Sequence, residues 1–86
     1  MKIILHRSFQ RQYNKLPLKI RKKFTERRDL FITDHLQPLL NNHALGGKYQ
    51  NCRSINITGD YRAIYFLLDS DTAIFIAIGT HPELYG

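Results

Sequence analysis

The sequence contains a single cysteine, no tryptophan and no long run of apolar residues. Cys52 has no partner for an internal disulfide, and without a second cysteine a thiolate metal site is not expected. No stretch approaches the roughly 18 consecutive apolar residues of a membrane span. The apolar part of the N-terminal MKIILHRSF is also shorter than the roughly 7 to 15 residues of a signal-peptide core. We therefore expect a cytoplasmic protein with no membrane partner.

Motifs of several enzyme classes are missing as well. The chain has no Gly-rich phosphate loop, no G-x-S-x-G turn and no pair of histidines at metal-ligand spacing on one element. No metal and no cofactor are therefore expected. Without internal repeats or a linker, 86 residues of which 43% are hydrophobic indicate one domain over residues 1–86.

The formal charge of +6 is unevenly distributed along the chain. Residues 1–36 hold ten Lys or Arg and three acidic residues, whereas residues 37–86 hold three and four. Basic residues can simply solvate the outer face of a helix. Their concentration in one part of the chain nevertheless favours a polyanion or an acidic partner, and above all nucleic acid.

The first half of the chain predicts a strand followed by two helices. KIILH is a short strand, and Ser8 is a candidate N-cap for a helix over residues 9–16. Pro17 suits the start of a second helix over residues 18–35. The apolar stripe of this helix contains Ile20, Phe24 and Phe31. Residues 37–51 mix turn residues with leucines and predict an irregular connection.

From Cys52 onwards the apolar pattern has a period of two. Strands are predicted over residues 52–58, 61–68 and 72–79, joined by the hairpin turns TGD and DSD. In the last strand one face should carry Ile74, Ile76 and Ile78, and the other Phe75 and Ala77. The order β-α-α-β-β-β predicts an α+β two-layer fold. Its antiparallel sheet would pack on a helical hairpin and leave the other face partly open.

The chain ends in IGTHPELYG, which has the pattern of a helix start. Thr80 and Glu83 match a capping box, and Pro82 fits the first turn. His81 and Tyr85 would then project from one face of that turn, just beyond the last strand. The C-terminal turn is therefore a candidate site.

The second half of the chain also holds side chains that suit metal-independent cleavage of RNA. They are His43, Arg53, Asp60, Tyr61, Arg62, His81 and Tyr85. Attack by the 2′-hydroxyl of RNA needs a proton acceptor, a proton donor and a cation beside the phosphate. Histidine suits either proton-transfer role, arginine offers a planar fork to phosphate oxygens, and tyrosine can stack on a base.

Each of these residues also has a purely structural interpretation. His81 and Tyr85 could pack against the last turn, and Asp60 could be a hairpin residue. Arg62 could form a cross-strand ion pair, which at a surface contributes only about 0–1 kcal/mol. His43 could be an ordinary loop residue. The sequence alone leaves these alternatives open.

Two stretches, NHALGGKYQNCRSINITGDYRAIYFL and IAIGTHPELYG, resemble the RelE/ParE superfamily of type II toxins, and most closely its YafQ-like branch. The matching positions are His43, Leu45, Gly47, Arg53, Asp60, Tyr61, Ile64, Tyr65, Gly79, Thr80, His81, Leu84 and Tyr85. The match covers residues 42–86 by motif and the helix pair by pattern and charge. It implies an mRNA interferase that cleaves mRNA in the ribosomal A site without a metal. It also implies a heteromeric complex in which a cognate antitoxin holds the toxin inactive.

The resemblance also implies roles for individual residues. His81 would be the leading general acid or base, assisted by Asp60 and His43. Tyr85 would orient or stack the RNA, and Arg62 would bind phosphate. The further residues expected to contact mRNA or ribosomal RNA are Arg53, Tyr61, Lys19, Lys22, Lys23 and Arg27.

Two positions depart from the pattern of the YafQ-like branch. Asn56 stands where relatives have histidine, and Ala77 stands where they have arginine. One proton-transfer group and one phosphate-stabilising cation are therefore missing. Two other functions remain open: a non-cleaving inhibitor of the same fold, as in the gyrase-directed ParE branch, and a degenerate toxin that only binds partners.

Overall fold

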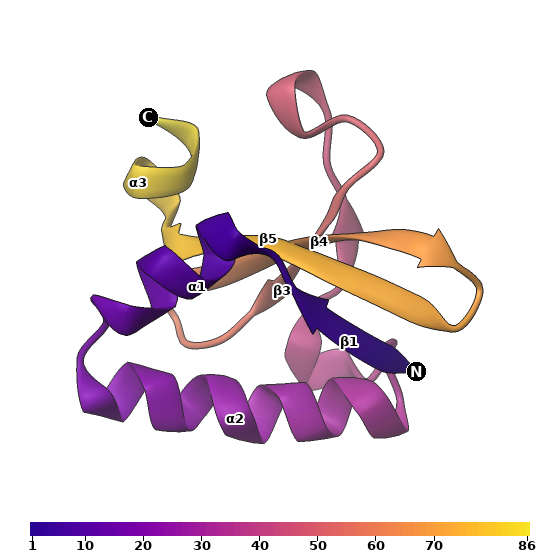
Figure 1. The fold of residues 1–86 in the computed structure, drawn as a ribbon, viewed down its shortest axis with the longest axis horizontal. Helices are drawn as coiled ribbons and strands as arrows, with labels where there is room; N and C mark the ends of the chain where they lie inside the picture. The colour runs from indigo at the N-terminus through magenta and orange to yellow at the C-terminus, as the bar shows by residue number, and fades with distance from the viewer.

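The computed structural model covers residues 1–86 and confirms the predicted α+β architecture (Figure 1). The elements are β1 Lys2–Leu5, α1 Arg7–Asn14, α2 Leu18–Thr33, β2 His43–Ala44, β3 Arg53–Asn56, β4 Tyr61–Asp69, β5 Thr72–Thr80 and α3 His81–Tyr85. Two 3-10 turns, η1 Pro38–Leu40 and η2 Gly47–Tyr49, lie between α2 and β3. None of the helices has both the length and the apolar character needed to cross a membrane.

The five strands form one sheet in the order β1-β5-β4-β3-β2. Strands β3, β4 and β5 make the predicted antiparallel meander. Strand β1 joins the edge of β5 in parallel, with Ile4 opposite Ile74. The sheet is therefore mixed rather than antiparallel throughout. A period of two cannot reveal this, because it fixes the face of each side chain and not the direction of a neighbouring strand.

The connection predicted to be irregular contains the short edge strand β2, which pairs with β3. Two residues are too few to show a strand periodicity. The backbone bends sharply on either side of β2, with positive φ at Asn41 (45°) and Asn51 (70°). Asparagine tolerates this left-handed region better than most residues, which lets the chain reverse twice within a short distance.

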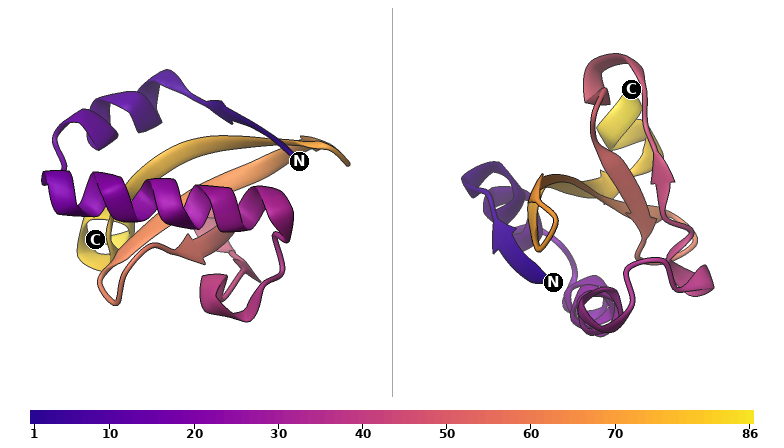
Figure 2. Two further views of the ribbon diagram at one scale, coloured as in Figure 1. Left: turned by 90° about the horizontal axis from the view of Figure 1, so that it is seen from below. Right: turned by 90° about the vertical axis from the view of Figure 1, so that its right-hand side faces the viewer.

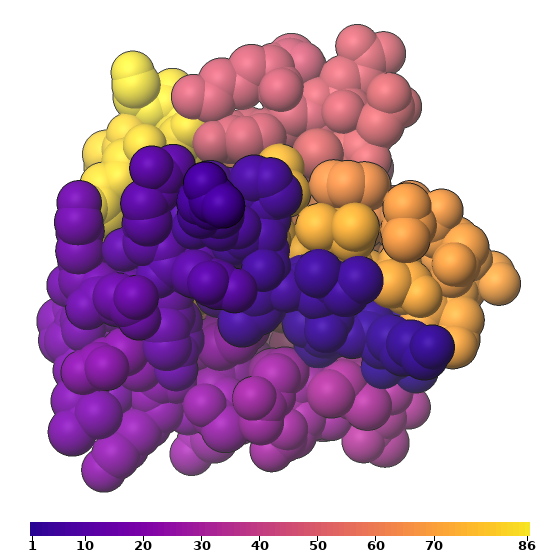
Figure 3. Space-filling view, viewed as in Figure 1, coloured from indigo at the N-terminus to yellow at the C-terminus, as the bar shows by residue number.

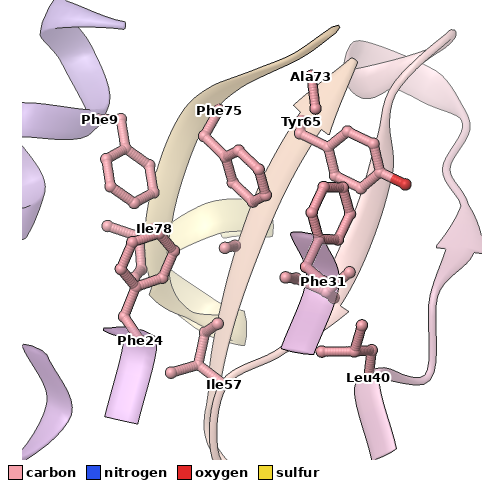
Figure 4. Close-up of a cluster of buried hydrophobic side chains, with 11 residues drawn as sticks. Phe9, Phe24, Phe31, Leu40, Ile57, Tyr65, Ala73, Phe75 and Ile78 are labelled. Atoms are coloured by element: carbon pink, nitrogen blue, oxygen red, sulfur yellow. The ribbon is translucent and has the colours of Figure 1, made fainter. Parts of the chain in front are cut away.

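Helices α1 and α2 cover one face of the sheet. An aromatic core fills the space between these helices and the sheet (Figure 4). Phe31 of α2 lies 5.0 Å from Tyr65 and 5.4 Å from Phe75, measured between ring centroids. Phe9 of α1 lies 5.1 Å from Phe24 of α2. Such edge-on and tilted aromatic contacts stabilise the layer beyond their burial alone. The predicted stripe of α2 is confirmed for Phe24 and Phe31, both buried.

A β-bulge changes the face assignment in β5. Ile64 of β4 lies opposite Ala77, but Tyr65 lies opposite Phe75, so Ile76 is an extra residue. Phe75 and Ile78 therefore both belong to the helix-side core, while Ala77 points to the other face. The prediction that Ile78 shares a face opposite to Phe75 is wrong, because a bulge inverts the alternation beyond it.

The start of α1 also differs from the prediction. The N-cap is His6, whose Nδ1 accepts a hydrogen bond from the Ser8 backbone N–H at 3.1 Å. The hydroxyl of Ser8 instead donates to the carbonyl of Ile76 at 2.6 Å. Ser8 is thus not a cap, because it fastens α1 to the bulged residue of β5.

A smaller apolar cluster lies on the second face of the sheet. It consists of Ile64, Ala77 and Leu84, with Leu45, Tyr49, Cys52 and Ile76 packed against it. In the right-hand view of Figure 2, β2 and β3 rise from the sheet beside α3. Cys52 lies half-buried in this cluster, and burial raises the pKa of its thiol.

Candidate functional site

The β3–β4 turn and the start of α3 lie at the same end of the sheet (Figure 1) and line one hollow. They do so because Tyr61, the first residue of β4, lies opposite Thr80, the last residue of β5. Between them is a hollow of about 430 Å³. Its lining residues are Gly59, Asp60, Tyr61, Arg62, Thr80, His81 and Pro82. Four of the predicted site residues are therefore neighbours around one hollow.

Helix α3 is held in place by the predicted capping box. Oε1 of Glu83 accepts hydrogen bonds from the Thr80 backbone N–H at 2.7 Å and from its hydroxyl at 2.9 Å. The Thr80 oxygen accepts in turn from the Glu83 backbone N–H. Leu84 is buried beneath the turn. The rings of His81 and Tyr85 lie 4.6 Å apart on one face, as predicted.

Because the Glu83 carboxylate caps α3, we expect the attachment of α3 to the end of β5 to depend on pH. Hydrogen bonds from Thr80, backbone first and hydroxyl second, lower the pKa of Glu83. A lowered folded-state pKa means that the cap is fully formed above the ordinary glutamate pKa of about 4.3 and is lost as the pH falls through the folded value. We expect the protection of the Leu84 and Tyr85 amides, which is the slowing of their exchange relative to an unstructured chain at the same pH, to fall over this acidic range, as measured by hydrogen exchange.

The matched control for this prediction is Glu83→Gln, which cannot ionise. In this variant exchange in α3 should be faster at neutral pH and should show no step of its own in the acidic range. An identical acidic step in both proteins would assign the transition to another carboxylate.

Arg62 is oriented by backbone carbonyls rather than by an acid. Its Nη1 donates to the carbonyls of Thr58 at 2.8 Å, Gly59 at 3.0 Å and Tyr61 at 3.1 Å. The three ion pairs of the structure all lie elsewhere, and none involves Arg62. The guanidinium therefore keeps its positive charge in a fixed position without an ion-pair partner. This arrangement suits a phosphate oxygen, which accepts strongly from the planar fork.

Asp60 contributes a carboxylate that has no partner in the structure. Its backbone N–H donates to the Thr58 hydroxyl oxygen at 3.2 Å, which fixes the turn. The side chain makes neither a hydrogen bond nor an ion pair. The hollow thus combines a free carboxylate, an imidazole and an arginine cation.

The two positions that depart from the family pattern have different surroundings. Asn56 lies directly across from Arg62 in the β3–β4 register, and its Oδ1 is buried without a hydrogen-bond partner. Ala77 lies beneath α3 in the apolar cluster with Ile64 and Leu84. A small side chain at this position leaves room for Leu84.

The structure does not bring His43 and Arg53 to the hollow. His43 lies on edge strand β2, and its Nδ1 is 2.8 Å from the carbonyl oxygen of Asn41. Arg53 lies opposite Tyr65 on the helix side of the sheet. Its Nε donates to the side-chain oxygen of Asn42 at 2.7 Å.

Helix α2, which carries the predicted basic residues, lies on the opposite side of the sheet from α3 (Figure 2). Lys19 and Lys22 are exposed, whereas Lys23 pairs with Glu26 at 3.3 Å. Arg27 donates to the carbonyl of Leu39 at 3.0 Å. This basic face is therefore separate from the hollow. A smaller hollow of about 290 Å³ shares Tyr61 with the first one. Its lining residues are Gln12, Lys15, Leu16, Pro17, Tyr61, Ile78 and Glu83.

Sequence reasoning missed Tyr49, which attaches η2 to α3. Its hydroxyl donates to the carbonyl of Leu84 at 3.1 Å, and its ring meets that of Tyr85 edge-on at 5.5 Å. The partners are 35 residues apart in the chain. No local signal could have found this contact.

Comparison with known proteins agrees with the fold and with the predicted resemblance. The family described as "Bacterial toxin of type II toxin-antitoxin system, YafQ" matches residues 1–86. No curated protein sequence matches the chain.

Solved structures of several toxins share this fold. YafQ from E. coli has a TM-score of 0.83 at 20% identity, covering 99% of this chain and 98% of that one. The E. coli DinJ-YafQ toxin-antitoxin complex gives 0.80 at 21% identity, covering 99% and 97%. A copper-bound mutant toxin from Helicobacter pylori gives 0.70 at 27% identity, covering 99% of both chains. The family match extends over the whole sequence, and the chain therefore belongs to the YafQ family of toxins from bacterial type II toxin-antitoxin systems.

Proposed function

We propose that this toxin is an endoribonuclease that cleaves mRNA on the ribosome by attack of a ribose 2′-hydroxyl on the adjacent phosphodiester. The observation that supports it is the hollow where His81, the unpartnered carboxylate of Asp60 and the carbonyl-anchored Arg62 lie together. These groups supply a proton acceptor, a proton donor and a phosphate-binding cation. The reaction needs no others.

In the proposed reaction Asp60 takes the proton of the 2′-hydroxyl as the bond from O2′ to phosphorus forms. The bond from phosphorus to O5′ breaks, and the imidazolium of His81 donates its proton to the departing O5′. The products are a 2′,3′-cyclic phosphate and a 5′-hydroxyl end. Arg62 stabilises the charge that gathers on the non-bridging oxygens.

Two tyrosines complete the proposed site. Tyr85 is 37% exposed and lies against His81, so it can restrict the imidazole and still offer a ring to an unpaired base. Tyr61 lines the hollow beside Arg62. Asn56 lies next to Arg62 in the β3–β4 register but does not line the hollow, so we assign it no contact with the substrate.

The charge of the chain and its family membership indicate two further partners, ribosomal RNA and an antitoxin protein. We propose that Lys19 and Lys22 contact ribosomal RNA in the cytoplasm, while the hollow holds the mRNA. As in the complexes of related toxins, a cognate antitoxin would bind and inhibit this chain. A protein partner for a chain of charge +6 should carry acidic residues.

The experiment that tests the proposal is primer extension on a defined mRNA translated by purified ribosomes. We expect discrete cuts in the A-site codon, with a cyclic phosphate on the upstream fragment and a 5′-hydroxyl on the downstream one. Growth arrest with intact mRNA would instead support a non-cleaving inhibitor. Harmless expression with no cuts would support a degenerate toxin.

Salt should weaken the interaction of this toxin with ribosomes. Binding of Lys and Arg to phosphates releases counterions, so the logarithm of affinity falls with the logarithm of salt concentration by about 0.7 per contact with single-stranded RNA. A filter-binding or sedimentation series from low to physiological salt measures this slope. A flat response would exclude phosphate contacts as the main source of binding.

A further inference from the structure

A run of side chains leads from the hollow across α3 to η2. The rings of His81 and Tyr85 are 4.6 Å apart, and the rings of Tyr85 and Tyr49 are 5.5 Å apart. The ammonium group of Lys48 lies 5.2 Å from the centre of the Tyr49 ring. The run therefore begins at the proposed proton donor and ends at a cation.

This run joins segments that lie side by side on the surface. In Figure 3 the yellow C-terminal segment meets the pink segment that contains η2 along the upper edge. The hydrogen bond from the Tyr49 hydroxyl to the Leu84 carbonyl fixes the two segments together. Burial raises the pKa of Tyr49, so its phenol stays protonated and remains a donor. The surface beside α3 is thus preformed.

The cation at the end of the run is free to bind an anion. Lys48 is exposed and belongs to none of the three ion pairs in the structure. Its contact with the Tyr49 ring holds the ammonium close to the aromatic surface. Aromatic rings next to a positive charge are the usual features of a surface that binds single-stranded nucleic acid, because bases stack and phosphates pair with the cation.

We propose that Tyr85, Tyr49 and Lys48 form a second nucleotide subsite for the mRNA strand, beside the hollow where cleavage is proposed. The unpaired base of a nucleotide next to the scissile bond packs against the exposed part of Tyr85 and Tyr49. Its phosphate pairs with Lys48. This subsite rests on the proposed endoribonuclease function, since it gives the direction in which the strand leaves the hollow.

The test compares Lys48→Gln with a matched control, Lys2→Gln, in single-turnover cleavage of mRNA on programmed ribosomes. Lys2 is also exposed and without an ion pair, but it lies on β1. We expect Lys48→Gln to raise the half-saturating toxin concentration about three- to tenfold, to leave the maximal rate unchanged and to lower the salt slope by about one contact. Lys2→Gln should match the wild type.

A second arm identifies the anion. Neutral methylphosphonate linkages are placed one at a time beside the cleaved position of the mRNA. At one linkage the substitution should weaken the wild type and have no further effect in Lys48→Gln, as expected for two changes that remove the same contact. This non-additivity distinguishes an mRNA phosphate from a ribosomal RNA phosphate.

The possible failures are distinguishable. Without cleavage by the wild type, both the proposed function and the subsite are wrong. If the wild type cleaves but Lys48→Gln behaves like Lys2→Gln, only the subsite is overturned. Full additivity at every linkage would likewise overturn it, because Lys48 would then contact something other than the mRNA strand.

Discussion

Replacing His81 with alanine is expected to slow mRNA cleavage by about 10²–10⁴-fold, the usual contribution of a positioned general acid or base. His81 lines the hollow with Asp60 and Arg62, and no other histidine does. The imidazole is exposed and makes no hydrogen bond in the structure, so its removal should leave the fold intact. Single-turnover cleavage at saturating toxin measures the rate.

The control for this prediction is His81→Gln, which keeps a polar side chain but cannot transfer a proton at neutral pH. Its rate should be as low as that of His81→Ala, while binding to the ribosome stays near that of the wild type. A variant that retains more than about a tenth of the wild-type rate would remove His81 from the proton-transfer role. Since His43 lies away from the hollow, His43→Ala separates the two histidines and should retain most of the activity.

Replacing Arg62 with alanine is expected to lower the maximal cleavage rate by about 10²–10³-fold, the typical loss when one donor to developing charge is removed. The effect should be large because Arg62 is the only arginine or lysine that lines the hollow. Arg62→Lys keeps the charge but loses the planar fork and should recover only part of the rate.

The carbonyl contacts of Arg62 also hold the β3–β4 turn, so a structural effect must be separated from a catalytic one. Thermal unfolding of Arg62→Ala and Arg62→Lys measures the structural part. Arg11→Ala, at an exposed position of α1, is the matched loss of charge outside the site and should leave the rate unchanged. If Arg62→Ala and Arg11→Ala cleave equally well, Arg62 does not bind the scissile phosphate.

Elements governed by local patterns could be predicted from the sequence. The apolar stripe of α2, the period of two in β3–β5 and the capping box of Thr80 and Glu83 depend on residues at most a few positions apart. The capping box also placed His81 and Tyr85 on one face of α3. Because β4 and β5 form a hairpin, the proximity of Asp60 and Arg62 to the start of α3 follows from the same local rules.

Only the tertiary structure decided the contacts between distant segments. It placed β1 parallel to β5, inserted a bulge at Ile76, and kept His43 and Arg53 away from the hollow. It also joined Tyr49 to α3. The sequence by itself determined the two long helices, the three strands of the meander, the basic first part and the residue types of the site. Which distant segments pack against one another was decided only by the tertiary structure, because neither periodicity nor spacing carries information about which distant surfaces meet.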